Sequence, residues 1–169
     1  VHVVAGIAVF YLISLLCNLS KKTSFMFKNS FMIACTTMAL FLLHPVQTQT
    51  VMYVVQARVE GLATLLMILS LIVFIQIIKS SNIVLKLVNF LLLIVLTLLS
   101  CGTKEIIIVL PFLLVLVDWF FISHEQWANI KYRLGLYFVS VVPLAALMVY
   151  KLGLKFFIEV ITFNTACGN

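Results

Sequence analysis

The residues best suited to chemistry stand close together, in residues 44–60, between two strongly apolar segments. In chain order, the polar side chains that matter most in this stretch are His44, Gln47, Gln49, Tyr53, Gln56, Arg58 and Glu60. Beside a bilayer, charged and hydrogen-bonding groups are costly unless they pair, face water or bind something polar. The stretch is therefore the first candidate for a binding site.

If residues 45–60 form a helix, their polar groups fall on two faces. The spacing i, i+4, i+7, i+11 gives one stripe, made of Gln49, Tyr53, Gln56 and Glu60. Gln47 and Arg58 share another face, and the planar fork of an arginine suits phosphate or carboxylate. His44 marks the helix entry, where unpaired amide groups favour an anion. Two interpretations stay open: an anion-binding site, or an interfacial helix whose polar face meets water and lipid headgroups.

Lys104 and Glu105 form a second charged group, directly before a long apolar run. Either the two side chains neutralise each other, or Lys104 holds an anionic ligand that Glu105 orients. Asp118, near the other end of that run, is expected to be a carboxylate in contact with solvent or the lipid interface. The cysteines are scattered without metal-ligand spacing, so we expect no zinc site, no other metal site and no disulfide framework.

The elements that position these residues must be membrane helices. Hydrophobic residues make up 64% of the chain, charged residues 9%, and the mean hydropathy is +1.26, which excludes an ordinary soluble domain. A net charge of +6 could suggest nucleic-acid binding in a soluble protein. Here the basic residues sit in short loops between apolar runs, where they act as topology signals and contact lipid headgroups. We therefore expect membrane lipid, and no nucleic acid, as a partner.

The apolar runs predict an all-α, polytopic transmembrane helical bundle of about six spans plus an outer interfacial helix, since a span needs about 20 apolar residues. The spans are drawn at 1–19, 30–45, 61–78, 83–101, 106–122 and 134–150. Pro111 and Pro143 fall inside the last two, where local kinks are expected. Residues 1–169 are interpreted as a single membrane domain, an interior piece of a longer protein.

The distribution of basic residues predicts the orientation. The loops after the first, third and fifth spans carry Lys21, Lys22, Lys28, Lys79, Lys86, Lys131 and Arg133. The opposite side carries the smaller set of Arg58, Lys104, Lys151 and Lys155. The side richer in basic residues is expected to be cytoplasmic. Residues 44–60 and 102–105 are then predicted to lie on the extracytoplasmic or lumenal side.

The same residues carry a family resemblance. The run His44-Pro45-Val46-Gln47-Thr48-Gln49, followed by Val51, Tyr53-Val54-Val55-Gln56 and Arg58, resembles the outer-loop motif of C-type (GT-C) membrane glycosyltransferases. These polytopic enzymes are related to protein O-mannosyltransferases and are often fused to tetratricopeptide repeats. The similarity continues at Lys104-Glu105 and Leu110-Pro111, includes His2, and covers roughly residues 1–122.

The resemblance implies transfer of a sugar from a polyprenyl-phosphate donor to an extracytoplasmic acceptor, a protein being one candidate. It implies donor contacts by His44, Gln47, Arg58, Lys104 and Glu105. Where the family motif sometimes has Glu, this chain has Gln49.

The resemblance also implies where the catalytic base lies. In such enzymes an acidic residue of the first outer loop acts as the base and often helps to hold a divalent metal ion. That loop would precede Val1, so the base is expected before Val1 and no residue of this chain is assigned to the role. The chain alone is therefore expected to transfer no sugar.

Two other classes of function stay open. A transporter or lipid-translocating protein could use the outer polar groups as a substrate gate, although such proteins are expected to carry broken helices and polar residues near the bilayer midplane. A non-catalytic membrane subunit could use residues 44–60 as a docking surface. The concentration of polarity at the outer ends of the spans favours the glycosyltransferase.

Overall fold

The computed structural model describes residues 1–20, 24–44, 54–103, 108–122, 133–138, 141–142, 145–146, 149 and 153, and within 54–58 it describes the backbone alone. This part of the chain is helical and contains no β-strand, which confirms the predicted all-α class. The helices are α1 (His2–Leu19), α2 (Phe25–Lys28), α3 (Ser30–Leu43), α5 (Val54–Lys79), α6 (Ile83–Thr103), α7 (Leu110–Val117) and the π-helix η2 (Asp118–Ile122).

Three helical segments are long and apolar enough to cross a membrane: His2–Leu19, Val59–Lys79 and Ile83–Thr103. Ser30–Leu43 and Leu110–Ile122 are apolar but shorter. These segments correspond to the first five predicted spans. Of the sixth, residues 134–138 form a helix and the remainder is described only in pieces. The chain therefore has the architecture of a helical membrane protein.

Helix ends follow local chemistry. The polar link Ser80-Ser81-Asn82 separates α5 from α6, and the Oδ1 atom of Asn82 accepts a hydrogen bond of 3.0 Å from the amide of Val84, as an N-cap does. Pro111 lies in the first turn of α7, after a short 3₁₀ turn at residues 108–109. A proline costs little there because the first amides of a helix have no intrahelical acceptor. The expectation that Pro111 kinks the interior of a span is therefore wrong.

The predicted boundary between an interfacial helix at 45–60 and a span at 61–78 is also wrong where the structure describes it. Residues 54–60 are the first turns of α5, which continues without a break to Lys79. A single Gly61 does not end the helix, because an interior glycine costs only about 1 kcal/mol. The polar residues at 56, 58 and 60 are thus attached to a membrane helix and not to a separate element. Residues 45–53 lie outside the described part.

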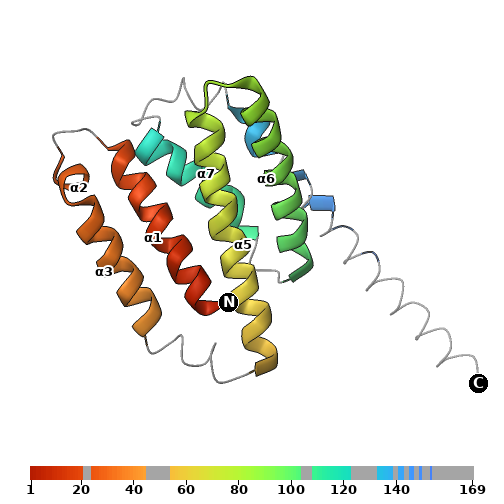
Figure 1. Ribbon diagram of the computed structural model, residues 1–169. Helices are drawn as coiled ribbons and strands as arrows, with labels where there is room; N and C mark the ends of the chain where they lie inside the picture. Colours follow the sequence, from red (N-terminus) through yellow and green to blue (C-terminus); the bar gives the residue numbers. More distant parts are fainter. Residues whose placement is uncertain are drawn as a thin grey trace, which may run out of the picture.

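Helix α5 is the centre of the bundle, with α6 packed along one side and α1 along another, and α3 lies beyond α1 (Figure 1). Of the 18-residue apolar window in each long helix, 61% is buried in α5, 39% in α1 and 22% in α6. Phe74 and Ile75 of α5 belong to the same core cluster as Leu93 of α6 and Leu114 of α7. Lipid tails are as apolar as leucine, so close packing holds such helices together more than burial from water does.

Small residues bring α1 and α3 together. Ala5 of α1 and Ala34 of α3 are almost completely buried. A Cβ atom added to Gly6 would lie 2.7 Å from the Cδ2 atom of Leu42. The glycine therefore permits the close approach of the two helices, as small residues commonly do in membranes.

We expect Gly6→Val to lower the free energy of unfolding by about 1–3 kcal/mol, because the added side chain would push Leu42 away and separate α1 from α3. Gly102→Val is the matched control, since nothing lies within 4 Å of a Cβ built at Gly102. Reversible unfolding in mixed micelles, followed by circular dichroism, measures both variants. Equal stability of the two variants would contradict the assigned contact.

Candidate functional site

The helix ends that bear or adjoin the predicted donor-site residues lie at one end of the bundle. This end holds the first turn of α1, the last turn of α3, the first turns of α5 and the last turn of α6 (Figure 1). The His2 ring stacks on Phe41, with centroids 5.5 Å apart, and its Nε2 atom lies 3.4 Å from the carbonyl oxygen of Leu42. Ala63 of α5 packs with Cys101 of α6. We call this end the donor end.

The structure describes the predicted site residues to different extents. His44 is the exposed C-cap residue of α3. Arg58 lies in the first turns of α5, where only the backbone is described. Gln47, Lys104 and Glu105 lie outside the described residues.

Val1, the residue before which the catalytic base is expected, also lies at the donor end. It is the exposed N-cap residue of α1, and its carbonyl oxygen accepts a hydrogen bond of 2.9 Å from the amide of Ala5. The predicted base itself lies outside the chain, so the structure assigns no residue to that role. The structure places Val1 beside the last turn of α3, because its neighbour His2 contacts that turn.

The backbone shows that three of the predicted donor contacts belong to, or directly follow, helix turns at this end of the bundle. Arg58 precedes Ala63 by five residues, about one and a half turns of helix. Lys104 directly follows Thr103, the last residue of α6, and Cys101 in that last turn packs with Ala63. The attachment points of the two cations are therefore held by one helix pair, and His44 ends a helix at the same side of the bundle.

Ser100 is a polar residue at this end that sequence reasoning missed. Its side chain is fully buried, and its Oγ atom has no hydrogen-bond partner in the described part of the chain. The hydroxyls of Thr64, Ser70 and Thr97 each donate to the carbonyl four residues earlier, at 2.8–2.9 Å. A buried hydroxyl without a partner costs about 1–3 kcal/mol, so a polar atom of a ligand or a water molecule would stabilise this position.

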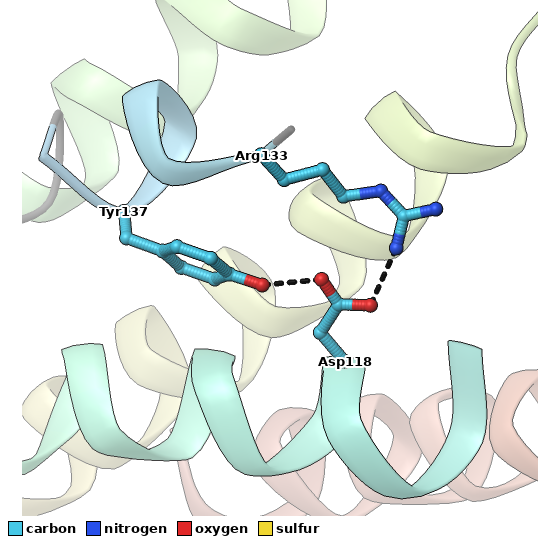
Figure 2. A network of polar contacts seen from close by, with 3 residues as sticks. All are labelled: Asp118, Arg133 and Tyr137. Atoms are coloured by element: carbon cyan, nitrogen blue, oxygen red, sulfur yellow. Dashed lines mark hydrogen bonds and ion pairs between the residues drawn. The ribbon is translucent and has the colours of Figure 1, made fainter. Parts of the chain in front are cut away.

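A second polar cluster lies away from the donor end, and Figure 2 shows its three members. The Asp118 side chain is completely buried. Its Oδ1 atom accepts a hydrogen bond from Nη1 of Arg133 at 2.5 Å, and its Oδ2 atom accepts one from the hydroxyl of Tyr137. The expectation of a carboxylate in contact with solvent or lipid headgroups is wrong, because the later segment folds back and supplies a cation and a hydroxyl.

Asp118 is also the first residue of the π-helix η2. Single π-turns within helices are frequent at functional sites, and ionisable groups buried in a membrane domain are mostly paired. We call Asp118, Arg133 and Tyr137 the carboxylate cluster. The cluster combines a residue that begins a π-helix with a buried ionisable group that is paired. In sequence its partners lie 15 and 19 residues from Asp118, a spacing with no helical period to reveal them.

No metal centre is evident in the part of the chain that the structure describes. There, no three His, Cys, Asp or Glu side chains gather in a way that could hold a metal ion.

The fold and the two sites together define the class of this protein. It is a helical membrane protein with the carboxylate cluster inside the bundle and with polar residues on the helix ends at the donor end. The comparisons with known proteins do not narrow this class. No protein-family model matches the chain, and no curated protein and no solved structure does so either.

Proposed function

We propose that this chain is part of a membrane glycosyltransferase that transfers a sugar from a polyprenyl-phosphate donor to an extracytoplasmic acceptor. The motif around His44 and Arg58 and the Lys104-Glu105 pair suggested this function. One structural observation supports it most: the helix ends that carry or adjoin these residues lie at one end of the bundle (Figure 1). A single phosphate group could then contact both cations, because Arg58 and Lys104 are attached to one packed helix pair.

In this proposal Arg58 and Lys104 hold the donor phosphate, and His44, Gln47 and Glu105 contact the phosphate or the sugar. Attraction between a cation and a phosphate is much stronger in a partly dehydrated site than in water. The apolar faces of the spans lie beside the prenyl chain. Six spans, with residues 44–60 and 102–105 on the extracytoplasmic side, complete the arrangement.

The catalytic base, with any divalent metal ion, comes from a loop that precedes Val1. The position of Val1 supports this part of the proposal, because a loop attached there would join the bundle at the donor end. The base would then act on an acceptor beside the sugar that His44, Gln47 and Glu105 contact.

A transporter or lipid-translocating protein is the second candidate. The burial of Asp118 and its pairing with Arg133 favour it, because charged groups inside membrane domains often mark transport paths. The hydrogen bonds described for the carboxylate, however, come from residues of the chain itself. The glycosyltransferase therefore has the stronger support.

Photo-crosslinking with a polyprenyl-phosphate-sugar analogue tests the proposal in membranes that contain the whole protein. We expect crosslinks at the donor end, and Lys104→Ala should weaken labelling about tenfold, as loss of a charge-assisted hydrogen bond predicts. Lys86→Ala is the matched control, because Lys86 is the same residue type near the first turn of α6, at its opposite end. Equal labelling of the two variants, or crosslinks confined to the carboxylate cluster, would refute the donor site.

A further inference from the structure

Helix α6 has one side that the described part of the bundle leaves uncovered. The helix lies at the edge of the bundle and makes its main contacts with α5 (Figure 1). Its inner side holds Leu93, Thr97 and Ser100, which are completely buried. Five apolar residues along the middle of the opposite side are between 47% and 63% exposed. We call them the α6 seam: Val84, Val88, Leu91, Val95 and Leu98.

The spacing of the α6 seam is that of a coiled coil. Its residues follow one another at intervals of four, three, four and three positions, which is the heptad repeat. This repeat keeps one stripe of a helix in contact with a partner helix over successive turns. Lipid tails require only that the outward side chains be apolar, so the repeat indicates a helix as the partner.

The residue types of the α6 seam indicate which helix this is. Val88 and Val95 take the a positions of the heptad, and Leu91 and Leu98 take the d positions. β-Branched residues at a with leucine at d favour two parallel strands. Two copies of one membrane protein have the same orientation, so a two-fold axis along the membrane normal brings their α6 helices together in parallel. A second copy of this chain therefore fits the seam.

The α6 seam is long enough for a stable contact. Residues 84–98 cover about 21 Å of helix, roughly two thirds of the hydrocarbon core of a bilayer. One pair of transmembrane helices can hold a dimer together in a membrane. Because lipid tails are as apolar as the seam, such a dimer depends on side chains that interlock and not on burial from water.

We propose that this protein forms a parallel homodimer through α6, in which the α6 seams of two copies interlock about a two-fold axis. Each seam position then lies opposite its own counterpart, as the symmetry requires. The contact uses the side of α6 that faces away from α5, and it does not depend on the proposed transferase activity.

Single-cysteine crosslinking of the whole protein in vesicles tests the geometry of the contact. In a variant whose native cysteines are replaced by alanine, Val88→Cys and Val95→Cys should form disulfide-linked dimers on mild oxidation, because a positions face each other across the axis. Leu85→Cys and Leu92→Cys are the matched controls, since both residues are exposed on α6 but take e positions, farther from the axis. Equal crosslinking at seam and control positions would contradict the contact.

Fluorescence energy transfer between labelled copies in vesicles measures the affinity of the dimer. Val95→Trp should weaken the dimer about tenfold, because an oversized side chain in the middle of the seam pushes the two helices apart. Leu92→Trp should leave the affinity nearly unchanged, and circular dichroism confirms that both variants are folded. Equal affinity of the two variants would overturn the proposal. So would an absence of energy transfer at every protein-to-lipid ratio, the result expected if lipid alone or another segment of the whole protein covers the seam.

Discussion

Replacing Arg133 with alanine should lower the free energy of unfolding by about 3–5 kcal/mol, the cost of removing one partner from a buried ion pair. Asp118 is completely buried, so its carboxylate would lose the cation that compensates its charge. Tyr137→Phe should cost less, about 1 kcal/mol, because it removes the hydrogen bond to Asp118 but leaves the ion pair in place. Unfolding in mixed micelles measures each variant against Lys86→Ala.

A double variant separates the ion pair from the packing around it. Asp118→Leu together with Arg133→Ala should recover much of the lost stability, because an apolar side chain in place of a buried charge leaves no charged group unpaired. If Arg133→Ala is as stable as Lys86→Ala, or if the double variant is no more stable than Arg133→Ala, the buried pair does not have the energetic role that its geometry indicates.

Arg58→Ala should weaken the binding of a labelled polyprenyl-phosphate analogue by about tenfold or more, because hydrogen bonds to charged groups contribute about 1.5–3 kcal/mol. Arg58→Lys should recover only part of the affinity, since a point charge cannot form the bidentate contact. Lys79→Ala, at the opposite end of α5, serves as the control.

The two Arg58 variants distinguish a ligand contact from a headgroup anchor. An anchor needs only a positive charge, so lysine would serve as well as arginine and donor affinity would barely change in either variant. Unchanged affinity in Arg58→Ala would therefore remove Arg58 from the donor site, whatever the role of Lys104.

The sequence predicted the helices best where apolar runs end at strong local signals. The boundary between α5 and α6 follows from Ser80-Ser81-Asn82, and the extent of α1 follows from the apolar run itself. The start of α5 was misplaced because residues 45–60 were interpreted as a separate interfacial helix, whereas residues 54–60 continue into the span without a break. Propensity alone does not determine whether one glycine ends a helix.

The candidate sites were predictable only in part. Amino-acid pattern and family resemblance indicated His44 and Arg58, and the backbone relates their positions to one end of the bundle. The carboxylate cluster was missed because it depends on tertiary contact between Asp118 and residues of a later segment. Ser100 was missed because a helical serine can bond its own backbone, and only the structure reveals the exception.

The unequal burial of the long helices also has a consequence for how the protein can change in evolution. In α5, where 61% of the apolar window is buried, a substitution must preserve shape as well as hydrophobicity. In α6, where 22% is buried, most positions must only remain soluble in hydrocarbon. Outside the α6 seam, the outer face of α6 can therefore exchange Leu, Ile, Val and Phe freely, whereas α5 must keep its side-chain volumes nearly constant.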